Sequence, residues 1–412
     1  MARGVSRRKC LEYSTYTLIV QLFIVGCFVF RKRVPPAGQQ NSDLPNPSAL
    51  FGGSGPHASM DPDSRLLLSI DEYNSAPESL RKMSTKPPTP PSALIPEEMV
   101  VLDGERQAPE FRLNFSEFGS SFDLSRKFKR HMFVAKGAKW DDLSRERKVC
   151  LGAQTSIDRI TWLIKLAEMW TGPLSIAIFT PDVEFSISKA YLGFLHRCYP
   201  KIRERASFHF VFPVEHPVKE SSNVNEIVGQ MSCEDPEKVL DFLLHTRDEK
   251  MMEWRTPYAY PQNLLRNTAK AGCQTEFTFI PDIDMIPTEG MDVELDKFLA
   301  TKKVQECKKC AYVVPTYEIS DKSDHYPVNK TDLLKAVKSG TARQFHLKLY
   351  ATNQKSSDLR RWEKMPQAEE MDVAYKVEKY LFKYEPLFIA RGDTPWFDER
   401  FVGFGMTRNT QV

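Results

Sequence analysis

The feature that most constrains the fold is a series of short apolar runs after residue 145, separated by stretches with helical periodicity. The runs occupy residues 149–153, 174–179, 208–212, 277–280 and 311–314. Between the first two, apolar side chains recur at helical spacing from residue 157 to residue 167. Because a strand, a crossover helix and a second strand form a βαβ unit, the sequence predicts an α/β domain. Its sheet should be mainly parallel, with helices on both faces.

An uncharged stretch of eighteen residues, 13–30, is a second constraint. As a helix it would be about 27 Å long, close to the hydrocarbon thickness of a bilayer. A cleaved signal peptide is the alternative, but the stretch ends in Phe30 and three basic residues rather than in small residues at a cleavage site. The sequence therefore predicts a cytoplasmic tail at 1–12 and a transmembrane signal-anchor at 13–30.

The orientation of this anchor is argued from the rest of the chain, because the basic residues on its two sides are nearly balanced. Asn114 and Asn329 begin N-x-[S/T] sequons, and six of the eight cysteines follow the anchor. Both features favour a type II protein with a lumenal domain, glycosylated at these two asparagines. In an oxidising lumen, Cys307 and Cys310 should form a disulfide or pair separately rather than bind zinc, because no second Cys/His pair follows at finger spacing.

Between the anchor and the domain, residues 34–110 are rich in proline, serine and glycine. Such composition predicts a disordered stem over 31–110, with the folded domain at 111–412; a proline-rich ligand at 86–91 is the alternative. The net charge is +3, but the first 33 residues carry +6, so the remainder carries −3. Without a basic surplus, nucleic acid is not an expected partner.

Two carboxylates, Asp282 and Asp284, come directly after the apolar run 277–280. Ligands of open α/β sheets gather at the carboxyl ends of strands. In an extended chain, residues i and i+2 project to the same side, so both carboxylates could bind one hard cation. A D-x-D tripeptide is also common by chance, as a loop or cap. Here apolar residues flank it, which makes two uncompensated carboxylates costly to bury.

Six stretches resemble the glycosyltransferases of family 49, in that family's order along the chain. They are LGAQTSIDR (151–159), WTGPLS (170–175), YPQNLLRN (260–267), PDID (281–284), VVPTYE (313–318) and FDERFVGFG (397–405). The resemblance implies a GT-A fold and an inverting, Golgi-located enzyme. It also implies Mn²⁺ on the D-x-D, and transfer of glucuronic acid from UDP-glucuronate to a glycan such as that of dystroglycan.

The resemblance also implies roles for individual residues. The expected nucleotide-sugar contacts are Ala153, Gln154 and Thr155 beside the uracil, Asp158 or Arg159 opening the next helix, and Arg266 and Asn267 before the metal strand. For Arg266 and Asn267, a solvated helix face is an equal alternative.

An inverting transfer needs one base for the acceptor hydroxyl. Asp398 and Glu399 are the candidates, Asp398 being preferred, although a salt-bridged Asp-Glu-Arg turn is the alternative. Arg391 could pair with the donor carboxylate through its guanidinium fork.

The sequence differs from the family after the last matched stretch. The family's domain normally continues beyond that stretch and carries a histidine that completes the metal site. None of the eight histidines follows Asp398. We therefore expect a truncated or catalytically impaired relative as one alternative, acting as a binding or scaffold partner of an active glycosyltransferase. A hydrolase is disfavoured, because Asp282 and Asp284 are too close in sequence to flank a glycosidic bond.

Overall fold

The computed structural model describes residues 16–19, 111–115, 120–220, 228–320, 323, 326–381, 383–403 and 408. The predicted tail (1–12) and stem (31–110) lie outside these residues, as does most of the predicted anchor.

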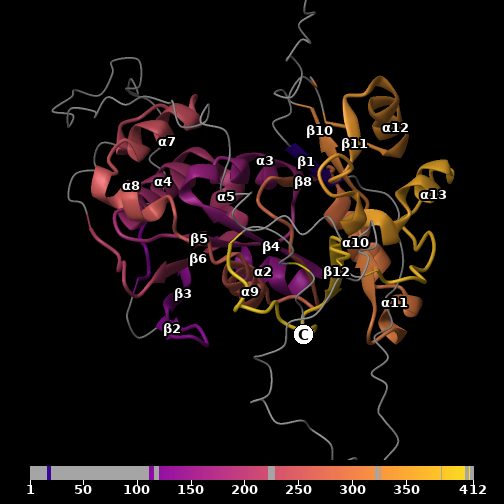
Figure 1. Cartoon of the computed structure of the whole chain (residues 1–412), viewed down its shortest axis with the longest axis horizontal. Helices are drawn as coiled ribbons and strands as arrows, with labels where there is room; N and C mark the ends of the chain where they lie inside the picture. Colours follow the sequence, from indigo (N-terminus) through magenta and orange to yellow (C-terminus); the bar gives the residue numbers. More distant parts are fainter. Residues whose placement is uncertain are drawn as a thin grey trace, which may run out of the picture. The chain divides into compact units, whose positions relative to one another are not determined.

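The main sheet has eight strands in the order β2-β3-β6-β5-β4-β7-β12-β9 (Figure 1). They are β2 Ser120–Phe122, β3 Phe128–Ala135, β4 Val149–Ser156, β5 Leu174–Phe179, β6 Ala206–Pro213, β7 Phe277–Phe279, β9 Ala311–Val313 and β12 Phe388–Arg391. All five apolar runs are strands of this sheet. The central strands β6, β5, β4 and β7 are parallel, and the outer pairings are antiparallel. The predicted parallel sheet is thus confirmed for its centre.

Helices cover both faces of this sheet, as predicted. Along β5, Ile176 and Ile178 pack into the same buried cluster as the apolar residues of α3 and α4, whereas Ala177 and Phe179 pack with α9. The helices are α2 Trp140–Glu146, η5 Ile157–Arg159, α3 Trp162–Met169, α4 Glu184–Cys198, α5 Pro200–Arg205, α7 Pro236–Leu244, α8 Glu249–Arg255, α9 Gln262–Gly272, α10 Met291–Leu299, α11 Lys302–Glu306, α12 Lys330–Ser339, η6 Ala351–Ser357 and α13 Leu359–Lys364.

Helix α9 lies closely on β4, and Gly152 makes this approach possible. A Cβ at Gly152 would lie 2.8 Å from Ile280 Cδ1 and 3.2 Å from the carbonyl oxygen of Ala269 in α9. Any larger residue would therefore push α9 and the end of β7 away from β4, the three elements that position the candidate site.

A second sheet has the order β11-β10-β1-β8, with β1 Tyr16–Ile19, β8 Met285–Pro287, β10 Thr316–Ile319 and β11 Ala342–Gln344. Strand β1 pairs in parallel with β8 and antiparallel with β10. These four residues of the predicted anchor are thus extended rather than helical: the strands on either side satisfy their backbone groups, and their sequence, YTLI, is rich in strand formers. No helix within the described ranges is both long and apolar enough to cross a bilayer.

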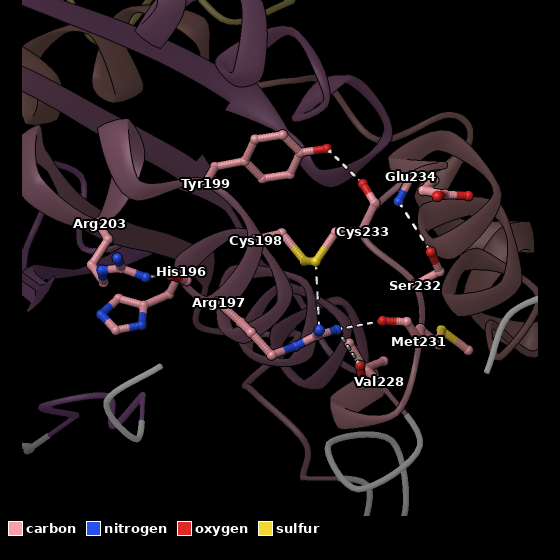
Figure 2. Close-up of a disulfide and its surroundings, with 10 residues drawn as sticks. All are labelled: His196, Arg197, Cys198, Tyr199, Arg203, Val228, Met231, Ser232, Cys233 and Glu234. Carbon is pink, nitrogen blue, oxygen red and sulfur yellow. Dashed lines mark hydrogen bonds between the residues drawn. A yellow bond between two sulfur atoms is a disulfide. The ribbon is translucent and has the colours of Figure 1, made fainter. Parts of the chain in front are cut away.

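Three disulfides join the six cysteines of the domain: Cys150–Cys273, Cys198–Cys233 and Cys307–Cys310. The disulfide predicted for Cys307 and Cys310 is confirmed. Figure 2 shows the second bridge, which ties the end of α4 to the segment before α7, where Arg197 also donates to the carbonyl oxygens of Val228 and Met231. The first bridge links the start of β4 to the residue after α9.

Candidate active site at the ends of β4 and β7

The carboxyl ends of β4 and β7 lie side by side, and they bring Gln154 to the first aspartate of the D-x-D. Gln154 and Asp282 form an isolated parallel bridge, and Gln154 Nε2 donates to Asp282 Oδ1 over 3.0 Å. The Tyr260 hydroxyl donates to Gln154 Oε1. Ala153 and Thr155 are buried on either side of Gln154. The D-x-D thus follows a strand, as predicted, and the structure adds that this strand end lies beside β4.

Asp282 is half-buried and lies at the centre of an ionic group with two largely buried arginines. Arg266 Nη2 and Arg408 Nη2 lie 3.1 Å and 2.9 Å from Asp282 Oδ1. Burial alone would raise the pKa of Asp282, but the charges of Arg408 and Arg266 and the Gln154 hydrogen bond outweigh it and hold that pKa well below its ordinary value. Burial and the charge of Arg408 lower the pKa of Arg266 to about 10. Asp282 is therefore a stable carboxylate at neutral pH.

Asp284 lies in a turn rather than in the extended chain that the sequence argument assumed. The turn is closed by the Met285 amide, which donates to the carbonyl oxygen of Asp282 over 3.0 Å. Asp284 Oδ2 accepts from Arg159 Nη2 over 2.7 Å. Burial and the charge of Asp282 raise the pKa of Asp284, against the opposing charge of Arg159. The two carboxylates are thus close enough to repel each other, although their backbone conformation differs from the predicted one.

This repulsion is the observation that tests whether the D-x-D fits a metal. Among the described residues, no three His, Cys, Asp or Glu side chains gather as a metal-binding group. The donor set is two half-buried carboxylates, Asp282 and Asp284, and a cation between them would offset the burial and the charge of Asp282 that raise the pKa of Asp284. These hard oxygen ligands suit a divalent ion whose further ligands come from water or a diphosphate.

The predicted nucleotide-sugar residue Asp158 belongs to a second ionic group, which the sequence did not reveal. Asp158 Oδ1 lies 2.6 Å from Arg247 Nη1, and Arg247 Nη2 lies 2.8 Å from Glu184 Oε1. Burial would raise the pKa of Asp158, but the hydrogen bond and charge of Arg247 lower it. Burial raises the pKa of Glu184 to about 7 despite the charges of Arg247 and Arg255. Beside Asp158 and Arg159, a cavity of about 510 Å³ opens along α3 and the start of α7.

Arg266 and Asn267 are 2% and 3% exposed, so the alternative of a solvated helix face is wrong. Arg266 contacts Asp282 and lies over the Phe397 ring at 5.6 Å. Asn267 holds the C-terminal motif: its Nδ2 donates to the Phe397 carbonyl and to Glu399 Oε1, and its Oδ1 accepts from the Phe397 amide. Helix α9 therefore fixes both the D-x-D and the segment that carries the candidate bases.

The two candidate bases differ in their contacts. Asp398 accepts from Arg400 through both carboxylate oxygens, which lowers its pKa. This is the salt-bridged turn that the sequence left as an alternative. Glu399 accepts from Asn267 over 2.9 Å and lies 3.9 Å from Arg130 Nη1.

Arg391 does not reach this site. In the antiparallel pairing of β12 with β7, Arg391 lies opposite Phe277, at the end of β7 remote from Asp282. Its guanidinium is paired with Glu276 and lies 4.8 Å from the Phe277 ring. The prediction that Arg391 binds the donor carboxylate is therefore wrong, because Arg391 lies at the other end of β7.

His346 is a histidine on which the charge of Asp282 acts, although the sequence resemblance places the metal-site histidine after Asp398. Burial lowers the pKa of His346, with the charges of Glu318 and Asp282 opposing the shift. No sequence spacing signals this proximity, because 62 positions separate His346 from Asp284.

The sheet order defines a mixed α/β protein, and its candidate site lies at the carboxyl ends of the parallel strands, where such sheets bind ligands. The chain belongs to the glycosyltransferase family described as "Glycosyl-transferase for dystroglycan", whose model matches residues 148–412. The family predicted from the sequence is thus confirmed.

Known relatives bear glucuronyltransferase names. The chain is 32% identical over 268 residues to beta-1,4-glucuronyltransferase 1 of Bos taurus and 31% identical over 268 residues to that of Homo sapiens, covering 64% of this chain and 62% of each relative. It is 25% identical over 326 residues to xylosyl- and glucuronyltransferase LARGE2s of Gallus gallus, covering 79% of this chain and 36% of that protein. The chain therefore spans about 62% of the length of the first two relatives.

Proposed function

We propose that this chain is an inverting, Mn²⁺-dependent glycosyltransferase with a GT-A fold. It transfers glucuronic acid from UDP-glucuronate to a glycan acceptor, of the O-mannosyl type found on dystroglycan. Its family and the names of its relatives support the reaction class. The observation that carries the proposal is the half-buried pair Asp282 and Asp284 beside Gln154, at the strand ends where such sheets bind ligands.

In this proposal Asp282 and Asp284 hold the metal, which when bound stabilises the negative charge of the departing diphosphate. Ala153, Gln154 and Thr155 lie on the strand that faces the nucleotide. Asp158 and Arg159 border the cavity at the mouth of the site.

For the base we favour Glu399 over Asp398. Both oxygens of Asp398 accept from Arg400, and its lowered pKa makes it a weaker base. Glu399 is oriented by Asn267, whose amide leaves the second carboxylate oxygen of Glu399 for an acceptor hydroxyl. A Glu399→Gln variant should then lose turnover while keeping donor binding, and an Asp398→Asn variant should lose less.

A binding or scaffold role beside an active glycosyltransferase is the second candidate. It is favoured by the contacts of Asp282 Oδ1, which already accepts from Gln154 and Arg266 and forms an ion pair with Arg408. Calorimetric titration of UDP with and without Mn²⁺ separates the two: metal-dependent UDP binding without transfer supports the scaffold, and transfer supports the enzyme.

The decisive assay incubates the purified lumenal fragment with UDP-glucuronate, Mn²⁺ and a xyloside acceptor, with a full-length relative in parallel. Transfer that is abolished by EDTA supports the proposal. No transfer by this chain, with an active relative, contradicts catalysis.

We also propose a Golgi membrane location, with the domain in the lumen and glycans on Asn114 and Asn329. Three disulfides suit an oxidising compartment. Asn114 is exposed, and Asn329 caps α12 through its Oδ1, which leaves its Nδ2 for a glycan. Residues Tyr16–Ile19 cannot form strand β1 and part of a membrane helix at the same time. Alkaline extraction of membranes tests the anchor: an anchored protein stays in the membrane fraction.

A further inference from the structure

We propose that Arg408 is a built-in cation that competes with the divalent metal for Asp282. This inference rests on the proposed metal-dependent donor site, and it adds a control of metal loading by the chain's own C-terminal segment.

The contacts of Asp282 are the first step. Its Oδ1 accepts hydrogen bonds from Gln154 Nε2 at 3.0 Å and Arg266 Nη2 at 3.1 Å, and Arg408 Nη2 forms an ion pair with the same oxygen at 2.9 Å. The two hydrogen bonds use the two in-plane lone pairs of Oδ1. A metal that binds Asp282 must therefore approach a carboxylate that the Arg408 guanidinium already neutralises.

The charges around the D-x-D give the second step. Arg159, Arg266 and Arg408 pair with Asp284 and Asp282, so these five formal charges sum to +1. Adding a divalent ion would raise the sum to +3 in a buried site, which is costly in a medium of low dielectric constant. Losing one guanidinium reduces that excess.

The way each arginine is held shows which one can leave. Arg266 is in α9, 2% exposed, bonded to Asn263 Oδ1 and stacked over Phe397, so its departure would disrupt the core. Arg408 is attached from the C-terminal segment by its amide to Glu385 Oε1 at 3.1 Å and by its Nη1 to the Ile280 carbonyl at 2.8 Å. Both contacts are single, partly buried hydrogen bonds, and the Arg408 side chain is 12% exposed against 3% for Arg266, so Arg408 is held less firmly.

The test measures Mn²⁺ binding directly, by the loss of the free Mn²⁺ signal in electron paramagnetic resonance, without nucleotide. Arg408→Gln should bind Mn²⁺ about tenfold or more tightly than the unaltered chain, because a unit charge a few ångströms from a divalent ion opposes its binding even in water. Arg408→Lys keeps the charge and should stay within about threefold of the unaltered chain. Arg145→Gln, which removes an exposed arginine paired with Asp142, is the matched control and should change nothing.

Hydrogen exchange supplies a second readout. Adding Mn²⁺ to the unaltered chain should speed exchange in the peptide that contains Arg408, because its amide loses Glu385 when the side chain is displaced. Thermal melting of each variant checks that it is folded.

The outcomes separate the inference from the proposed function. Equal or weaker Mn²⁺ binding by Arg408→Gln, with metal-dependent UDP binding intact in the unaltered chain, overturns the competition alone. Absence of Mn²⁺ and UDP binding in both the unaltered chain and Arg408→Gln overturns the metal site and the competition together. Tighter binding that is lost again in the double variant Arg408→Gln, Asp284→Asn places the metal at the D-x-D and supports the inference.

Discussion

Replacing Asn267 by alanine should release the segment that carries the candidate bases. The substitution removes three hydrogen bonds, of 2.8, 2.9 and 2.9 Å, to Phe397 and Glu399. At about 1 kcal/mol for each neutral bond, and roughly 1.5–3 kcal/mol for the bond to a carboxylate, the loss is on the order of 4 kcal/mol. The buried backbone of Phe397 would be left without these partners.

Calorimetric melting measures this loss, and at about 2 °C or more per kcal/mol it should lower Tm by roughly 8 °C. Thr268→Val is the control, because it is a buried neighbour of similar volume that loses one bond within the helix, to the Leu264 carbonyl. Asn267→Asp should also destabilise, since it keeps the acceptor for the Phe397 amide but faces Glu399 with a second carboxylate. If Asn267→Ala melts like Thr268→Val and exchange of amides 393–403 stays slow, the three bonds do not hold this segment.

Three further outcomes are expected. Asp284→Asn should abolish Mn²⁺-dependent UDP binding and leave secretion nearly intact, because an amide is a much poorer ligand for a hard cation; unaltered titration of UDP would sink the metal assignment. Burial lowers the pKa of His209 from 6.5 to about 3, its ring accepting from the Phe133 amide and contacting Ser175. As the pH falls below about 6.5, His209 binds a proton in the unfolded chain but not in the folded one. The free energy of unfolding therefore decreases by up to roughly 1.4 kcal/mol per pH unit. The Tm of His209→Gln should depend less on pH between 4 and 6.5 than that of the unaltered chain. Arg391→Gln should leave the Kd for UDP-glucuronate unchanged. A Kd raised more than about fivefold, near 1 kcal/mol of binding free energy, would show that Arg391 does bind the donor.

The central strands were predictable because buried parallel strands are continuous apolar runs, as residues 174–179 and 208–212 are. Strand β3 was not, since Lys129, Arg130 and His131 interrupt its apolar positions; it pairs antiparallel with β6 on one edge and with the short strand β2 on the other. Strand β12 has only four residues, and nothing local shows that it pairs with β7. Register between distant strands is a tertiary property, which is why Arg391 was expected at the wrong end of the sheet.

The site was predictable where its residues lie at the carboxyl end of an apolar run, as Gln154 and Asp282 do after the runs 149–153 and 277–280. Its conformation was not: Asp284 was expected on an extended chain, but the Met285 amide closes a turn there. The ionic partners were also hidden, because Glu184 and Arg247 are 63 positions apart and only folding brings them together.

The placement of β12 has a consequence for the synthesis of the chain. Strand β7, which leads to the D-x-D, pairs with β4 on one side and with β12 on the other. β12 begins at Phe388, 109 positions after β7 ends at Phe279. At about 5–20 residues per second, a ribosome needs roughly 5–20 s to cover that interval. During this time the nascent β7 has an unpaired edge, to which a chaperone or a misdirected neighbouring strand can bind before the sheet closes.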